Sequence, residues 1–381
     1  MTMTIEERGL VFDANGRPAH ECVNCFTCLR RLSSGALIAS FQCAAQKHDV
    51  KATIRMCRSD DDGRTWKDLG SPFDTSFGGV AGSLAGGEIV ELSPGNLLLF
   101  TTWFDRSDPH RPLYDPVTQG VLHSKQLYCS SNDEGKTWSG WQELVTPGLT
   151  GTAISGPALR WSDGTIAFSF ESYKEYDDPN PGRHAAWLAI STDNGETFPR
   201  RHLVAQHPEH KLFYWDQRLC TGKDVGDYYA CFWTHDLEQQ QDLTVHFRKG
   251  NINDNSRPHE HIKATNITGQ IAAPLMLADG RLLMFVVDRT KPRTMSLWIS
   301  HDDGDTWPEA ERLVVHNHDE QGRLSQGESN IDFDQYWDDM AKWTFGHPAI
   351  ADLSDNRVLV LWYAGEPGKL SIHWARVNVG A

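Results

Sequence analysis

A short pattern recurs four times in this chain and constrains its fold more than any other feature. Each copy reads Ser-x-Asp-x-Gly-x-Thr followed by Trp or Phe, at residues 59–66, 131–138, 191–198 and 300–307. In such a turn we expect the Asp side chain to bond the backbone two residues on and the Gly to take a positive φ, while the aromatic ring covers the turn. The pattern predicts one self-supporting hairpin turn, repeated along the chain.

A second element recurs six times. In each copy an apolar strand, a small or polar turn and a second apolar strand are followed, after a loop, by a third strand. The second strands are predicted at 36–41, 96–104, 165–170, 228–233, 281–287 and 357–363. The third strands are predicted at 53–57, 126–129, 186–190, 243–247, 295–299 and 370–374.

Six such units, rich in strands and nearly free of amphipathic helix, predict an all-β fold: a six-bladed β-propeller that forms one domain over residues 1–381. The abundance of Gly (32 residues) and Trp (14 residues) suits short strands joined by tight turns. The chain ends too soon after residue 374 for a full fourth strand in the sixth unit. We therefore expect residues 9–12 to supply that strand and close the ring.

Composition and charge exclude several classes of protein. The formal net charge is −15, so the chain cannot neutralise a run of nucleic-acid phosphates. No segment approaches the roughly 18 continuous apolar residues of a membrane-spanning helix. The first residues contain no apolar signal core. We expect a cytoplasmic protein with neither a nucleic-acid nor a membrane partner.

Three of the eight cysteines, Cys22, Cys25 and Cys28, are separated by two residues each. This spacing invites a metal site, but no partner Cys or His pair follows at the spacing of a zinc site. In an extended strand Cys25 would also point away from the other two thiols. We expect reduced, buried thiols and no cofactor, although a divalent ion in the mouth of the channel is left open.

The recurring turns are similar to the Asp boxes of the sialidase (neuraminidase) superfamily, and the resemblance covers nearly the whole chain. It implies a six-bladed propeller in which these turns are structural and lie away from the site. Residues 36–59 resemble the strand, loop and strand of the family's first blade, whose loop carries the catalytic acid/base Asp. Asp49 occupies that place, so the resemblance implies that Asp49 is the general acid/base.

Other family positions hold different residues. Residues 23–26 read Val-Asn-Cys-Phe where the family begins its first blade with an Arg-Ile-Pro triplet. Asp216 stands where the family has a Glu that tunes the nucleophile, and His235 replaces the second carboxylate-binding Arg. Arg293 matches the third Arg, and His347 lies where the family has its nucleophilic Tyr. The resemblance thus implies a sialidase scaffold with a rebuilt site, which is not expected to cleave ordinary sialosides.

These residue types suggest roles. The carboxylates of Asp49 and Asp216 can transfer protons. The imidazoles of His235 and His347 can accept a proton or ligate a metal near neutral pH. Arg293 and its neighbour Arg289 can bind a carboxylate bidentately. Sugar rings stack on aromatic faces while their hydroxyls bond to acids and arginines. The remaining substrate-binding candidates near the mouth are Arg218, Trp215, Tyr363, Asp105 and Glu171. Structural hydrogen bonds or surface ion pairs are the alternative roles for all of them.

Three functions follow from these candidates. The first is an exo-acting glycoside hydrolase on a non-standard, possibly acidic sugar, with Asp49 as general acid. The second is a lyase that uses His347 or His235 as base while Arg293 neutralises a uronate carboxylate. The third is a glycan-binding propeller without catalysis. A saccharide is the expected partner in each case, and the long loop at 105–115 is expected to form a lid or one wall of the pocket.

Overall fold

Strands make up almost all of the regular structure in this computed structural model, which describes residues 2–254, 256–318 and 340–380. The helical turns η1 (Ala19–Glu21), η2 (Pro258–His261) and η3 (Glu309–Glu311) are short. The prediction of an all-β chain is therefore confirmed. Within these ranges, no helix has the length and apolar character of a membrane span.

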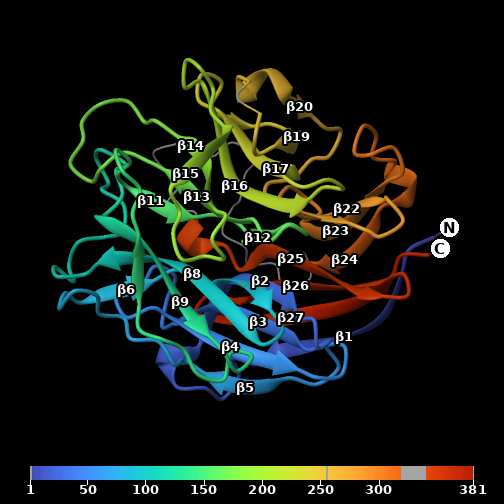
Figure 1. Ribbon diagram of the computed structural model, residues 1–381, viewed down its shortest axis with the longest axis horizontal. Coiled ribbons are helices and arrows are strands. Elements are labelled where there is room, and N and C mark those ends of the chain that lie inside the picture. The colour runs from blue at the N-terminus through green and yellow to red at the C-terminus, as the bar shows by residue number, and fades with distance from the viewer. Residues whose placement is uncertain (1, 255, 319–339, 381) are drawn as a thin grey trace.

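The strands form successive antiparallel units along the chain (Figure 1). The first unit contains β2 (Val23–Arg31), β3 (Leu37–Ala44), β4 (Thr53–Ser59) and β5 (Lys67–Gly70). The second unit contains β6 (Gly82–Leu84), β7 (Glu88–Ser93), β8 (Asn96–Asp105), β9 (Ser124–Ser131) and β10 (Gln142–Leu144). The third unit contains β11 (Thr152–Ile154), β12 (Leu159–Arg160), β13 (Ile166–Ser172), β14 (Ala185–Ser191) and β15 (Arg200–Ala205).

Three further units follow. The fourth unit contains β16 (Leu212–Thr221), β17 (Asp227–Asp236), β18 (Gln241–Asp242), β19 (His246–Asn251) and β20 (Ile262–Ala264). The fifth unit contains β21 (Ala272–Met276), β22 (Leu282–Asp288), β23 (Thr294–Ser300) and β24 (Leu313–Asn317). The sixth unit contains β25 (Phe345–Ser354), β26 (Arg357–Glu366), β27 (Lys369–Asn378) and the N-terminal β1 (Thr4–Phe12).

One predicted strand is displaced in the structure. The third strand of the fourth unit was expected at 243–247, but β19 begins at His246. The reason is that the preceding residues pair with the far end of β17, where Asp242 lies opposite His235 and the Leu243 N–H donates to the Thr234 carbonyl at 2.8 Å.

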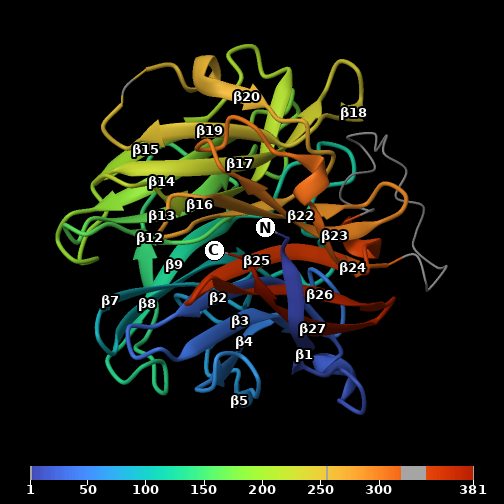
Figure 2. The same cartoon turned by 90° about the vertical axis from the view of Figure 1, so that its right-hand side faces the viewer.

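The first and sixth units belong to one sheet. A parallel bridge between Val23 of β2 and Leu370 of β27 joins them. β1 pairs antiparallel with β27, from Thr4 opposite Asn378 to Phe12 opposite Ile372, and lies beside the C-terminal strands in Figure 2. The N-terminal segment therefore pairs with the sixth unit as predicted, although the strand begins before the expected residue 9.

The hydrophobic core lies between the sheets, because both faces of most central strands are apolar. The rings of Phe100 in β8 and Phe168 in β13 stack 4.6 Å apart and join the second unit to the third. Phe247 of β19 packs with Trp298 and Trp307 and joins the fourth unit to the fifth. Each sheet thus buries apolar surface against the next one in the chain.

The four recurring turns share one hydrogen-bonding pattern. In the first, the Ser59 hydroxyl accepts the Gly63 N–H at 2.9 Å, and the Asp61 carboxylate accepts both the N–H and the hydroxyl of Thr65. The four glycines have φ values from 82 to 85°. The predicted positive φ is confirmed, whereas the Asp bonds the residue four positions on rather than two. The Trp66 indole N–H caps the turn by donating to the Gly63 carbonyl.

The turn geometry predicts that a methyl group costs more at Gly304 than at Gly35. Both glycines have φ near +85 to +89°, so alanine costs about 1–2 kcal/mol of backbone strain at either site. A Cβ at Gly304 would lie 2.6 Å from two ring atoms of Phe247, while nothing lies within 4 Å at Gly35. We expect Gly304→Ala to lose about 1–3 kcal/mol more than Gly35→Ala in denaturant unfolding. Equal losses would contradict the packing of this turn against the fourth unit.

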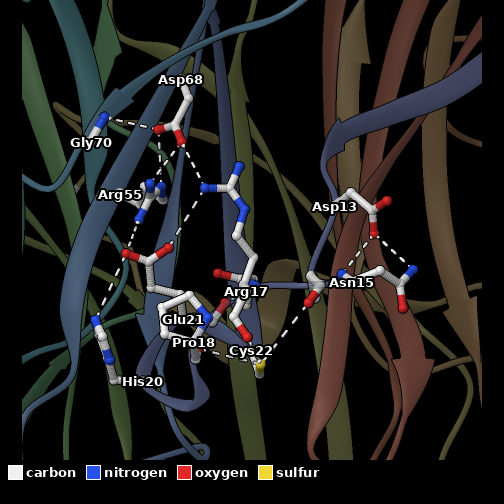
Figure 3. Close-up of polar contacts among 12 residues, drawn as sticks. Asp13, Asn15, Arg17, Pro18, His20, Glu21, Cys22, Arg55, Asp68 and Gly70 are labelled. Atoms are coloured by element: carbon white, nitrogen blue, oxygen red, sulfur yellow. Dashed lines mark hydrogen bonds and ion pairs between the residues drawn. The ribbon is translucent and has the colours of Figure 1, made fainter.

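An ion-pair cluster fixes the segment that connects β1 to β2 (Figure 3). Arg55 donates to both carboxylate oxygens of Asp68, at 2.9 and 2.7 Å, and its Nη1 lies 3.1 Å from Glu21 Oε1. Arg17 Nη1 lies 3.5 Å from Asp68 Oδ2 and 3.7 Å from Glu21 Oε2. Both guanidiniums also lie over the ring of Phe12, 4.4 and 4.7 Å from its centre. Phe12 thus attaches the end of β1 to the first unit.

We expect truncation of this ring to destabilise the whole protein. Phe12 is 3% exposed and packs on Phe41 at 5.4 Å, so Phe12→Ala should lower the free energy of unfolding by about 3–5 kcal/mol. Leu10, in the same strand, is 40% exposed, and Leu10→Ala should change it by less than about 0.5 kcal/mol. Thermal or denaturant unfolding measures both. A Phe12→Ala protein as stable as the parent would show that β1 does not hold the sheet together.

Candidate functional site

The first strands of three units, β2, β16 and β25, each carry a break in their pairing register. The breaks fall between residues 25 and 28 in β2, between 215 and 218 in β16, and between 346 and 349 in β25. At each break a residue other than glycine takes the left-handed conformation: Phe26 (φ 56°), Asp216 (φ 46°) and His347 (φ 58°). A bulge of this kind turns a side chain out of the regular alternation of a strand, and bulges are frequent next to active sites.

The three side chains at these bulges line one cavity. The remaining lining residues come from the first four units, together with Met340, which precedes β25. The polar and aromatic ones that bear on the chemistry are Gln42, His48, Glu88, Arg106, Tyr114, Tyr173 and Arg218. This cavity is the candidate functional site.

The Arg218 guanidinium connects three units inside the cavity. Its Nη1 lies 3.4 Å from Glu88 Oε1, its Nη2 donates to His347 Nε2, and the same nitrogen lies 4.0 Å from Asp216 Oδ1. A guanidinium has no acceptor, so His347 Nε2 must offer a lone pair. Burial, with a further contribution from Arg218, holds the pKa of His347 well below its ordinary value. His347 is therefore a neutral acceptor whose lone pair is already used.

The Asp216 carboxyl is set up to exchange a proton near neutral pH. Its pKa is raised to about 7, chiefly by burial; the carboxylate of Glu171 also raises the pKa, while Arg218 and Arg289 lower it. Its side chain is 25% exposed, so it is open to the cavity. Glu171, by contrast, is enclosed, where it accepts the Gln217 N–H at 2.9 Å. Asp216 is thus the carboxyl in this cavity best suited to general acid or base chemistry.

Asp49 lies in the loop between β3 and β4, beside the cavity rather than in its lining. Its Oδ1 accepts the Lys51 N–H at 2.8 Å. The adjacent residue, His48, does line the cavity, and its carbonyl accepts a hydrogen bond from Arg106 Nη2 at 3.1 Å. Asp49 therefore stands at the rim, next to two residues of the site, and its acid/base role stays a prediction.

His235 and Trp215 lie away from the cavity, contrary to their expected position at the mouth. His235 is 1% exposed, its Nδ1 lies 2.8 Å from Asp242 Oδ1, and its ring stacks on Trp215 at 5.3 Å. Trp215 is also 1% exposed and packs edge-on against Trp233. Both rings are enclosed by other side chains, so neither offers a face or a free edge to a substrate.

The two arginines expected to bind a carboxylate do not line the cavity either. Arg289 is 5% exposed; its guanidinium lies 3.9 Å from the centre of the Trp343 ring and donates to the Phe345 carbonyl at 3.3 Å. Arg293 is half-buried, and its carbonyl accepts the His318 N–H at 3.0 Å. Arg289 acts on the site through its charge, because it lowers the pKa of both Asp216 and His347.

Tyr363 and Asp105 also stand outside the lining. Tyr363 is 2% exposed, and its hydroxyl accepts a hydrogen bond from Lys47 Nζ at 2.9 Å. Asp105 accepts the Ser107 N–H at 2.8 Å and lines a separate surface cavity. The loop that follows Asp105 does form one wall of the site, as predicted, because Tyr114 lies in the lining and Val121 is tied to the third unit by the Lys174 carbonyl.

The three clustered cysteines have different surroundings. Cys22 Sγ contacts the Pro18 carbonyl at 3.4 Å, Cys25 Sγ donates to Gln42 Oε1 at 3.7 Å, and burial raises the pKa of Cys28 well above its ordinary value. Within the described ranges, no group of three or more His, Cys, Asp or Glu side chains is placed to hold a metal ion.

Glu88 and His48 belong to the site but are not among the residues that the sequence analysis names, whereas Tyr114 lies in the loop that it predicts as a wall. Glu88 directly follows Gly86 and Gly87, which interrupt the first strand of the second unit between β6 and β7. A glycine pair inside an apolar run is the signal that could have marked this break. The burial of Glu88 raises its pKa, and Arg218 opposes that shift.

Comparison with known proteins identifies a fold. No family model and no curated protein matches the sequence. Among solved structures, a protein of unknown function from Dyadobacter fermentans has a TM-score of 0.71 at 18% identity, with 99% of each chain covered. Hadza microbial sialidase Hz136 has a TM-score of 0.68 at 15% identity, covering 97% of this chain and 68% of that one. Trypanosoma rangeli sialidase has a TM-score of 0.62 at 12% identity, covering 97% and 59%. The chain therefore has a sialidase-like fold.

The raised pKa of Asp216 predicts a specific dependence of stability on pH. An Asp with a pKa of about 7 when folded and about 3.9 when unfolded binds more protons in the folded state between these values. Its contribution to stability therefore falls as the pH rises through that range. Asp216→Asn removes the titration. We expect the melting temperature of the variant, relative to the parent, to rise between pH 4 and pH 7 and to level off above. A difference independent of pH would contradict the raised pKa.

Proposed function

We propose that this chain is a carbohydrate-active enzyme, a glycoside hydrolase, built as a single six-bladed propeller over residues 1–381. A second cavity supports the propeller arrangement, since all six units contribute first-strand residues to it. These residues include Thr27, Glu88, Leu159, Arg218, Ala273 and Ala349. First strands surround the central channel of a propeller. The pairing of β1 with β27 completes the sixth blade in this arrangement.

Asp216 is the observation that carries the proposed activity. Its carboxyl opens into the cavity, and its pKa of about 7 means that both protonation states are populated at neutral pH. A glycoside hydrolase needs one carboxylic acid that protonates the leaving oxygen and a second carboxylate that activates water or attacks the sugar. We assign the acid role to Asp216 and the second role to Asp49 at the rim. This exchanges the role that the family resemblance implies for Asp49.

The remainder of the lining suits a sugar. Phe26, Phe104, Tyr114 and Tyr173 supply aromatic surface that can cover the apolar face of a pyranose ring. Burial raises the pKa of Tyr114, so its phenol stays protonated and uncharged. These features are compatible with a saccharide ligand.

Elimination by a histidine base has less support than hydrolysis. His347 already accepts a hydrogen bond from Arg218 through Nε2. His235 is enclosed by Trp215 and Asp242. A base must reach the proton that it removes, and neither imidazole has a lone pair open to the cavity lining described above.

Incubation with a panel of neutral, uronate-containing, sulfated and sialylated glycans, followed by product mass, tests the proposal. Hydrolysis adds the mass of water, whereas elimination does not. On the substrate identified in this way, we expect Asp216→Asn to lower kcat about 10²–10⁴-fold, because an amide cannot deliver the proton, while binding of the glycan persists.

Asp49→Asn is the paired variant. We expect it to lower kcat as well. The basic limb of the pH–rate profile, where the rate falls as the acid Asp216 loses its proton, should stay at the same pH in the Asp49→Asn variant. A variant at Asp216 that keeps the parent's rate would refute the assignment. Binding of a glycan without any product, from every glycan in the panel, would favour a binding propeller instead.

A further inference from the structure

Two guanidiniums line the candidate site, and their electrostatic surroundings differ. Arg218 is compensated, since it lies within ion-pair distance of both Glu88 and Asp216. Arg106 forms no ion pair with any residue in the described ranges. Asp49 acts on it through space, without a contact. The site therefore contains one cation whose charge is not neutralised by a bonded carboxylate.

The structure holds Arg106 in one orientation. Its Nε donates to the Ser83 hydroxyl at 2.8 Å and its Nη2 to the His48 carbonyl at 3.1 Å, while its own N–H donates to the Ala81 carbonyl at 2.9 Å. The residue is 5% exposed and lines the cavity. Its third nitrogen, Nη1, has no hydrogen-bond partner in the described part of the chain. Nη1 is nevertheless not fully buried. Nη1 is therefore open to the cavity.

Within the described ranges, no side chain in contact with Arg106 supplies a negative charge. His48, whose carbonyl accepts a hydrogen bond from Arg106, is neutral, because burial together with Lys47 and Arg106 lowers its pKa to about 3. Lys47 adds a second positive charge, although its ammonium is already held by the carbonyls of Met340 and Trp343 and by the Tyr363 hydroxyl. A buried cation without a paired anion is costly, and a ligand oxyanion would reduce that cost.

We propose that Arg106 binds an acidic group, a carboxylate or a sulfate ester, on the sugar that occupies the cavity. The inference rests on the proposed function in taking a sugar as the ligand. The residue that binds the acidic group of the ligand then belongs to the second unit. Arg293 and Arg289, which the sequence analysis expected in this role, lie outside the lining. The fixed Nε and Nη2 leave Nη1 to donate to the anion, and the Ser83 hydroxyl lies beside it as a second polar group.

Binding to matched pairs of sugars tests this inference without requiring turnover. The probes are methyl glucuronide against methyl glucoside, and N-acetylglucosamine 6-sulfate against N-acetylglucosamine, measured by titration calorimetry or ligand-observed NMR with the full chain. We expect the parent to bind at least one acidic member about tenfold or more tightly than its neutral partner. The pair that shows the preference identifies carboxylate or sulfate.

Arg106→Gln should remove this preference, because the amide has no charge to offer the anion, and Arg106→Lys should keep part of it. Arg111→Gln is the matched control: it removes one charge from an exposed side chain of the same loop and should leave the preference intact. If Arg106→Gln does not fold, the Arg106→Lys variant still tests whether the planar guanidinium, with its several N–H donors, is needed for the preference. An unchanged preference in a folded Arg106 variant, equal binding of acidic and neutral sugars, or no binding of any acidic probe would overturn the inference.

These outcomes separate the inference from the proposed function. A neutral glycan that is hydrolysed in an Asp216-dependent way, with no acidic preference, would support the enzyme and overturn the role of Arg106. An acidic preference that depends on Arg106, with no product from any glycan, would support the anion subsite and overturn the hydrolase.

Discussion

The guanidinium of Arg218 is the interaction on which the candidate site depends. It lies between a carboxylate of the second unit, an imidazole of the sixth and a carboxylate of its own strand. Because a guanidinium only donates, it fixes His347 as an acceptor. Because its charge is shared with Glu88, it only partly offsets the burial of Asp216, whose pKa stays near neutrality. Glu88 and Arg218 line both cavities, so the same ion pair stands between the site and the second cavity.

The bulges link this chemistry to the fold. A left-handed residue other than glycine costs about 1–2 kcal/mol, and Phe26, Asp216 and His347 each adopt this conformation next to the site. The sheets supply the compensating energy, since the strands on either side of each bulge are largely buried and pair with their neighbours again beyond it. As a result, side chains from three units point into one cavity, which they would not reach from strands without bulges.

These bulges also explain which parts were predictable from the sequence. The recurring turns and alternating apolar strands depend on local patterns, and they led to the all-β fold, the strand order and the pairing of β1. Which side chains reach the site depends on which face of its strand each residue lies on. Beyond a bulge, the inward and outward faces of a strand exchange. The family resemblance and the position near the mouth made both Trp215 and its neighbour Asp216 candidates, whereas the bulge buries Trp215 and turns only Asp216 into the cavity. The position of His235 depends in turn on that strand, since it lies opposite Phe213 in β16.

The protonation of Asp216 is the central claim, and it can be measured directly. Selective ¹³C labelling of aspartate carboxyls, with the Asp216→Asn protein to assign the resonance, gives the pKa of this one group by NMR titration of the intact chain. The account predicts a midpoint near pH 7, with the carboxyl substantially protonated at pH 6. A midpoint below about pH 5, in the range of ordinary aspartates, would contradict it.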